Sequence, residues 1–116
     1  MENKSKSRLV GMIGFAMRAG KVVIGTDLVC ASMSWKGAKR ARLVLLTSNA
    51  SDGTKKKISN KCEFYGVDMR VIDIDGDALG QILGKTYAPA VIAISDDRFA
   101  EEIRLANDAS DGNNQG

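Results

Sequence analysis

Residues 19–31 read Ala-Gly-Lys-Val-Val-Ile-Gly-Thr-Asp-Leu-Val-Cys-Ala and combine three local structural signals. Residues 22–24 are all β-branched, which predicts a short strand, and Gly25 ends that strand. Thr26 is a good N-cap and Asp27 suits the positive end of a helix dipole, so we expect a helix to begin at Thr26. A glycine followed by a helix N-terminus presents unpaired N–H groups, which bind anions and hydrogen-bond acceptors.

The rest of the chain alternates between helical and strand patterns. Helices are expected at about 6–18, 26–35, 52–65, 78–83 and 95–105, and strands at 22–24, 43–47, 67–72 and 90–94. The second and fourth strands are apolar throughout, as strands covered on both faces must be. The pattern predicts an α/β protein with a parallel or mixed sheet between two helical layers. We expect one domain over residues 1–106 and a disordered polar tail over residues 107–116.

The charge distribution is uneven although the net charge is only +3. Residues 1–61 carry 13 Lys and Arg against 3 Asp and Glu, and residues 62–116 carry 4 against 11. Such asymmetry is typical of nucleic-acid binding, and solvated helix faces are the ordinary alternative. Histidine is absent, which removes the commonest general base and metal ligand.

The composition also indicates where the protein resides. No apolar run approaches the roughly 18 residues of a membrane span, so no membrane association is expected. Cys30 and Cys62 form no CxxC motif, which favours free, buried thiols in the cytoplasm.

Three short motifs resemble known sites, but each has a simpler interpretation. Residues 80–86, Gly-Gln-Ile-Leu-Gly-Lys-Thr, have three residues between the glycines where a phosphate-binding loop needs four. Residues 73–77, Asp-Ile-Asp-Gly-Asp, place glycine fourth where a calcium loop needs it sixth, and a polar turn before a helix is favoured. The lysine run at 55–57 is most simply a solvated helix face, unless it lies beside Gly25.

Several segments, taken in order, point to one family. They are Ala-Gly-Lys at 19–21, Gly-Thr-Asp-Leu-Val at 25–29, Lys-Gly-Ala-Lys-Arg-Ala-Arg-Leu-Val-Leu-Leu at 36–46, Asn-Ala-Ser at 49–51 with Lys-Lys-Ile at 56–58, Leu-Gly and Gly-Lys within 79–85, and Ala-Val-Ile-Ala-Ile at 90–94. This order and spacing resemble the kink-turn RNA-binding ribosomal-protein family of the L-seven-Ae and L-thirty-e type, and in particular its short bacterial branch. The resemblance implies a three-layer α/β/α sandwich with a mixed four-stranded sheet. It also implies recognition of a sharply bent RNA helix with tandem sheared G·A pairs.

The resemblance also suggests which residues contact RNA. Archaeal members keep an Asn-Glu pair that contacts guanines, and Asp27 and Leu28 stand at those positions here. Asp27 can accept from guanine N1–H and N2–H, whereas Leu28 can only pack. Backbone contacts of Gly25 and Thr26 would be kept, and we expect a side chain at Gly25 to block RNA while leaving the fold intact. The archaeal basic residue before the glycine is Ile24 here.

Further contacts are expected from lysines and from the loop before the last strand. Phosphate contacts would fall to Lys21, Lys36 and Lys39. In the family that loop packs on a flipped-out nucleotide, and here it contains Tyr87, Ala88 and Pro89. Tyr87 could stack on a base or could pack under the helix at 78–83; both interpretations stay open.

The sequence therefore predicts a cytoplasmic, monomeric, non-enzymatic protein that binds kinked structured RNA on a ribosome or another ribonucleoprotein, with no cofactor and no metal. Two other classes are retained as alternatives. One is a protein–protein interaction module on the same fold, which the loss of the Asn-Glu pair would suit. The other is a small nucleotide-binding protein that uses residues 84–86.

Overall fold

The computed structural model describes residues 4–114, with side chains described as far as Ala109. Its elements, in chain order, are α1 (Lys4–Arg18), β1 (Val22–Ile24), α2 (Thr26–Ser32), β2 (Leu43–Leu46), α3 (Asp52–Tyr65), β3 (Asp68–Val71), α4 (Gly76–Leu83), β4 (Val91–Ile94) and α5 (Asp97–Asn114). Every helix and strand expected from the sequence is present in the expected order, and β1 has the predicted bounds.

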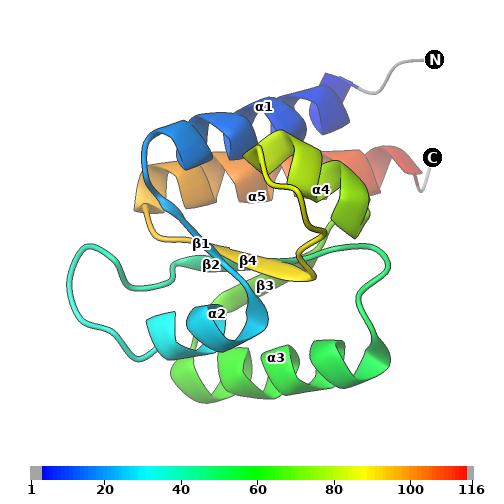
Figure 1. The fold of residues 1–116 in the computed structure, drawn as a ribbon. Helices are drawn as coiled ribbons and strands as arrows, with labels where there is room; N and C mark the ends of the chain where they lie inside the picture. Colours follow the sequence, from blue (N-terminus) through cyan, green and yellow to red (C-terminus); the bar gives the residue numbers. More distant parts are fainter. Residues whose placement is uncertain (1–3, 115–116) are drawn as a thin grey trace.

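The four strands form one mixed sheet in the order β1-β4-β2-β3. β2 and β3 are parallel, whereas β4 runs antiparallel to both β1 and β2. Helices α1, α4 and α5 lie on one face of the sheet, and α2 and α3 lie on the other (Figure 1). The predicted α/β/α sandwich with a mixed four-stranded sheet is confirmed. β1 is an edge strand, so one side of it has no neighbouring strand.

The central strands β2 and β4 build the core because both of their faces are covered. Leu43, Leu45, Ile92 and Ile94 pack toward the layer of α1, α4 and α5. The alternate residues Val44, Leu46, Val91 and Ala93 pack toward α2 and α3. All eight side chains are fully buried. At roughly 1.5–3 kcal/mol for each large aliphatic side chain buried, this pair of strands contributes strongly to stability.

Helix α5 extends well beyond the end predicted at Leu105 and beyond the domain boundary predicted at residue 106. Asn107 is buried, and Asp108 is bound by Arg70 on β3. The sequence suggested a tail because residues 107–114 are small and polar; tertiary contacts override that weak local preference. Residues 115–116 of the predicted tail lie outside the described residues.

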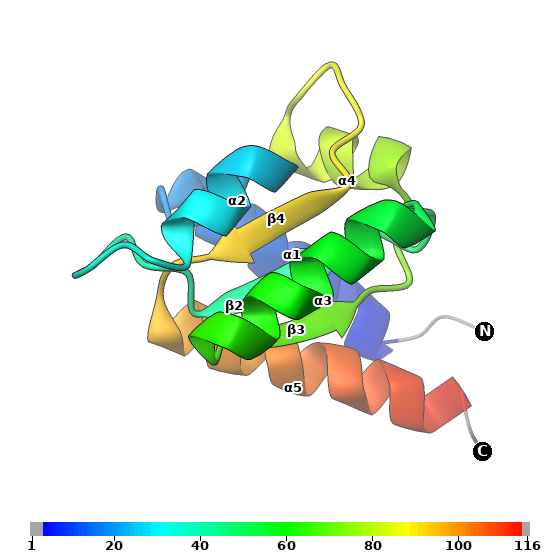
Figure 2. The same cartoon turned by 90° about the horizontal axis from the view of Figure 1, so that it is seen from below.

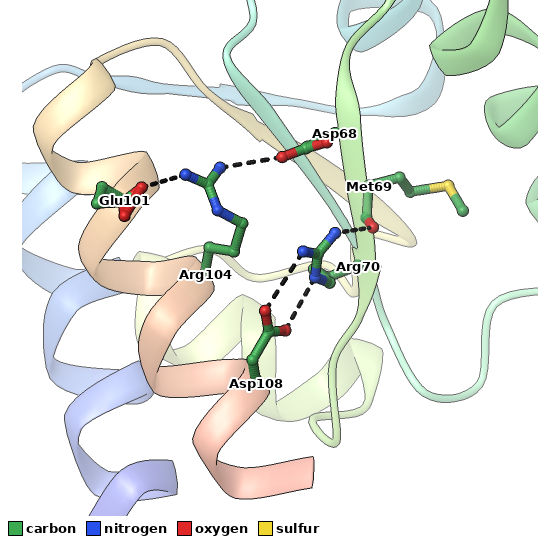
Figure 3. Close-up of polar contacts among 6 residues, drawn as sticks. All are labelled: Asp68, Met69, Arg70, Glu101, Arg104 and Asp108. Atoms are coloured by element: carbon green, nitrogen blue, oxygen red, sulfur yellow. Dashed lines mark hydrogen bonds and ion pairs between the residues drawn. The ribbon is translucent and has the colours of Figure 1, made fainter. Parts of the chain in front are cut away.

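Two arginines connect β3 to α5 (Figure 3). The guanidinium of Arg70 donates to both carboxylate oxygens of Asp108, at 2.9 Å from Nε and 3.3 Å from Nη2. Arg104 on α5 donates back to Asp68 on β3 at 3.1 Å and also to Glu101. Both pairs join β3 to α5, with the arginine on β3 in the first and on α5 in the second. Together they help to hold α5 alongside β3.

The loop of residues 84–90 packs closely on α4 through glycines. A Cβ added at Gly80 would lie 2.3 Å from the carbonyl oxygen of Tyr87, and one at Gly76 would lie 3.1 Å from Cβ of Ala88. Gly84 ends α4 in a left-handed conformation with φ of 72°. Its N–H donates to Gln81, and the next N–H donates to the carbonyl of Gly80, as in a Schellman motif. Because these N–H groups already have partners, they cannot surround a phosphate. Helix packing and helix termination therefore explain the two glycines of the apparent phosphate-binding loop.

The acidic stretch before α4 also has a structural explanation. Asp75 is the N-cap, and its Oδ1 accepts from the N–H of Ala78 at 2.8 Å. Asp73 pairs with Lys6 on α1 at 3.4 Å. Across residues 4–114 no cluster of three or more His, Cys, Asp or Glu could hold a metal ion, and no helix is long and apolar enough to cross a membrane.

We expect Gly80→Ala to lower the free energy of unfolding by about 2 kcal/mol, because the added methyl meets a backbone carbonyl that cannot yield without moving the 84–90 loop. Urea denaturation measures the effect. Gly53→Ala on α3 is the matched control, since a Cβ there meets nothing within 4 Å. The control should gain up to about 1 kcal/mol from helix propensity. Equal effects of the two substitutions would show that the loop does not pack on α4 in this way.

We expect Asp108→Asn to lower stability by less than about 1 kcal/mol at neutral pH, because the pair is half exposed and screened by solvent. Hydrogen bonds from Arg70 lower the pKa of Asp108 below its ordinary 3.8. The stabilisation is therefore present above the unfolded pKa and is lost as pH falls through the folded one. Thermal unfolding measured at a series of pH values should show the melting temperatures of the wild type and of Asp108→Asn approaching each other in acid. Glu63→Gln, an exposed position on α3, is the control and should show no such approach of melting temperatures. A difference between the wild type and Asp108→Asn that stays constant with pH would rule out the Arg70–Asp108 pair.

Candidate nucleic-acid interface

Gly25 connects β1 to α2 in a backbone conformation that only glycine adopts readily. Its φ is 102° and its ψ is 148°. Gly25, and not Thr26, is the N-cap of α2, and no side chain caps the helix there. The sequence suggested Thr26 because threonine caps well, but the chain enters the helix one residue earlier. A side chain at Gly25 would strain the backbone, so a substitution there is expected to lower stability as well as to affect binding.

The N–H of Gly25 donates to the carbonyl of Val91 at 3.0 Å, which extends the pairing of β1 with β4 by one residue. Val91 directly follows the 84–90 loop. The hydrogen bond therefore places residues 25–28, which we call the Gly25 turn, beside a loop about 60 positions further along the chain. Figure 2 shows the start of α2 next to this loop at one end of the sheet. The sequence predicted each segment separately, and the structure brings the two together.

A groove of about 480 Å³ follows the free side of β1. Residues 22–24 form its floor, and Leu28 and Tyr87 contribute to its walls. Leu28 is 49% exposed and Tyr87 is 55% exposed, so both apolar surfaces face solvent. We call this feature the edge groove. An exposed aromatic ring beside an exposed leucine can pack on a flat, largely apolar face such as that of a nucleobase.

Two lysines and the single tryptophan also line the edge groove. Lys39 and Trp35 come from the connection between α2 and β2, and Lys85 comes from the 84–90 loop. Neither Trp35 nor Lys85 was predicted as a site residue. Trp35 looked like the last residue of a helix, and Lys85 like part of the phosphate-loop resemblance. A tryptophan next to a basic connector, and a lysine two positions before an exposed tyrosine, were the signals that could have identified them.

The other residues predicted to contact RNA lie outside the edge groove. Lys36 is exposed in the same connection as Lys39, but it does not line the groove. Lys21 is half-buried, and its carbonyl accepts from the N–H of Ser95 at 2.9 Å. Ala88 is exposed, whereas Pro89 is buried, so the proline side chain supports the loop and does not reach a ligand.

Asp27 is fully exposed at the start of α2, and a lysine of α3 lies beside it. Nζ of Lys57 is 3.7 Å from Oδ1 of Asp27. The end of the lysine run at 55–57 therefore lies beside the Gly25 turn. The sequence predicted a role in binding for this run only if it lay there. A solvent-exposed pair at this distance is weak and is readily replaced by a ligand.

Chemically, the site is equipped for binding. It combines backbone donors at a helix start, lysines, and exposed apolar and aromatic surface. The buried Cys62 lies away from it in the α2–α3 layer, where burial raises the pKa of the thiol to about 11. A thiol with that pKa is almost entirely protonated at neutral pH, so it is a poor nucleophile.

Comparison with known proteins agrees with the fold and with the proposed family. Residues 8–104 match the sequence profile of the family described as Ribosomal protein L7Ae/L30e/S12e/Gadd45. A Bacillus subtilis protein named RNA-binding protein YlxQ is 40% identical over 92 residues, covering 79% of this chain and 87% of its own length. A protein of the same name from Enterococcus faecium is 30% identical over 104 residues, covering 90% and 95%.

Solved structures show the same architecture. A Bacillus halodurans protein of unknown function superposes with a TM-score of 0.78 at 28% identity, covering 87% of this chain and 97% of its own. The 15.5kD RNA binding protein of Giardia lamblia superposes with a TM-score of 0.71, covering 97% and 92%, and at 15% identity it supports the fold alone. The sandwich, the order of the motifs and the match over residues 8–104 lead to one conclusion: the chain belongs to the Ribosomal protein L7Ae/L30e/S12e/Gadd45 family.

Proposed function

We propose that the protein binds structured RNA of the kink-turn type, as part of a ribosome or another ribonucleoprotein. One observation carries the proposal: the Gly25 turn and the 84–90 loop meet at the edge groove, with Lys39 and Lys85 beside them. The relatives named as RNA-binding proteins support it. We also propose that the protein binds without catalysis and acts as a cytoplasmic monomer.

Binding would proceed by capture of the RNA's shape. The start of α2 would enter the widened groove at the kink, where the absence of a side chain at Gly25 allows close approach of the RNA backbone. Lys39 and Lys85 would contact phosphates on either side, with Lys36 adding charge from the same connection. Tyr87 would stack on a base that the bend has released from its helix. Its exposure favours this role over packing under α4.

Direct reading of bases would be limited to Asp27. Its carboxylate can accept hydrogen bonds from the N1–H and N2–H groups of one guanine, but it has no donor for O6 or N7. When RNA binds, the ammonium of Lys57 would exchange its ion pair with Asp27 for one with a phosphate. A phosphate oxygen is the stronger partner of an exposed ammonium. Leu28 would only pack. Specificity would therefore depend more on the shape of the kink than on base identity.

The deciding experiment compares a kink-turn RNA with the same RNA whose sheared G·A pairs are replaced by Watson–Crick pairs. Fluorescence anisotropy should show at least tenfold tighter binding to the kinked RNA, because only that RNA presents the bend. Equal affinities would overturn the specific proposal and leave only nonspecific attraction. Binding of a protein partner at the same groove, without RNA binding, would favour the interaction-module alternative.

We expect Tyr87→Ala to weaken binding of the kink-turn RNA by about tenfold, which corresponds to the loss of one stacked base. Phe15→Ala on α1 is the matched control, since both aromatic side chains are 55% exposed and Phe15 does not line the edge groove. Lys85→Gln should lower the slope of log affinity against log salt by about 0.7–0.9. If Tyr87→Ala and Phe15→Ala behave alike, the loop does not contact RNA.

We expect Gly25→Ala to weaken kink-turn binding by more than tenfold and also to lower stability by about 1–3 kcal/mol, because φ of 102° strains an alanine. The two effects are separated by titrating RNA at a temperature where circular dichroism shows the variant to be folded. Gly66→Ala is the control, with φ of 68° at the cap of α3. It should lose stability but keep its RNA affinity. RNA binding by folded Gly25→Ala at wild-type strength would place the interface elsewhere.

A further inference from the structure

Helix α3 carries a second, separate cluster of exposed side chains. Asn60, Lys61 and Phe64 lie three, four and seven positions after Lys57, which places all four side chains on one face of the helix. Together with the half-buried Tyr65 they line a shallow hollow of about 520 Å³. We call this group the α3 patch. Tyr65 packs at the margin of the core in the α2–α3 layer. The other four residues of the patch do not belong to the core.

Phe64 has the most exposed ring among the large apolar side chains of the described residues, at 80%. Its ring meets that of Tyr65 edge to face, with centroids 4.9 Å apart and planes at 84°. An edge-to-face pair leaves ring surface uncovered. An exposed aromatic ring is a suitable platform for stacking a nucleobase.

The two lysines of the α3 patch are placed where they repel each other. Lys57 and Lys61 are four residues apart on the same helix face, an arrangement that destabilises a helix for like charges. Lys57 is paired only with the exposed Asp27, and no carboxylate of the described residues lies within ion-pair distance of Lys61. A bound anion would relieve this repulsion. The patch therefore has the charge of a phosphate-binding surface around an aromatic centre.

We infer that the α3 patch binds a single-stranded RNA segment, which would be continuous with the RNA at the Gly25 turn. A base would stack on Phe64, phosphates would lie against Lys57 and Lys61, and the amide of Asn60 would hydrogen-bond to the base edge or to a 2′-hydroxyl. The contact between Lys57 and Asp27 joins the patch to that turn, and α3 lies beside α2 on the same face of the sheet (Figure 2). This inference extends the proposed function and rests on its RNA-binding part.

The chemistry of the patch favours RNA over a protein partner. A protein interface needs an extended apolar centre, whereas here a single pair of aromatic rings, one of them half-buried, is flanked by two cations and an amide. Stacking needs only one ring face, and two lysines provide electrostatic attraction that does not depend on sequence.

The test uses the full chain and a fluorescently labelled oligouridylate of about eight nucleotides, a length within the range that one single-strand site covers. Phe64→Ala should weaken its binding by about tenfold. Replacing both lysines, Lys57→Gln with Lys61→Gln, should reduce the salt slope by about 1.4, because each phosphate neutralised on a single strand contributes about 0.7. Phe15→Ala and Lys4→Gln on α1 are the controls and should bind as the wild type does.

The design separates this inference from the proposed function. Phe64→Ala should keep its affinity for a kink-turn RNA without extensions, and Tyr87→Ala should keep its affinity for oligouridylate. Loss of kink-turn specificity with oligouridylate binding intact would overturn only the proposed function. Oligouridylate binding that is absent, or unchanged by Phe64→Ala, would overturn the inference. Self-association that Phe64→Ala abolishes in sedimentation, without any effect on RNA, would instead assign the patch to a protein interface.

Discussion

The antiparallel pairing of β1 with β4, extended by the hydrogen bond from Gly25 to Val91, is the constraint on which the candidate interface depends. β1 is only three residues long and lies at the edge of the sheet, so β4 is the only strand of the described residues that pairs with it. Because the Gly25 turn follows β1 and the 84–90 loop precedes β4, antiparallel pairing places both at the same end of the sheet. A parallel pairing would separate them by the length of the strands, and the edge groove would not exist.

The uneven charge distribution has both a structural and a functional part. Three cations of the basic half pair with carboxylates of the acidic half: Lys6 with Asp73, Arg8 with Glu102 and Arg42 with Asp97. These exposed pairs contribute little to stability, but each neutralises a cation that would otherwise add to the positive charge of the basic half. The lysines that remain near the edge groove and on α3 lie on or beside the other layer. The charge asymmetry of the sequence is therefore partly neutralised at the surface. The positive charge that remains is concentrated where RNA binding is proposed.

Several local rules of protein structure are broken around the proposed interface. Helix α2 starts without a side-chain cap, Leu28 and Phe64 expose apolar surface, and Lys57 and Lys61 repel each other on one helix face. Other helix ends follow the rules, since Ser51 and Asp75 cap their helices and glycines end α3 and α4. Proteins usually depart from such rules at functional sites, where a ligand supplies what the folded chain lacks.

The sequence by itself determined the elements, the apolar strands and the Gly25 turn, because these depend on periodicity, side-chain branching and the conformational freedom of glycine. It misjudged the cap of α2 and the length of α5, since a tertiary hydrogen bond and the Arg70–Asp108 pair outweigh weak local preferences. Only the tertiary structure decided which segments meet: Lys85 with the Gly25 turn, Lys57 with Asp27, and the 84–90 loop with Gly80. Those contacts follow from strand order, and strand order is set by long-range burial that no short stretch of sequence specifies.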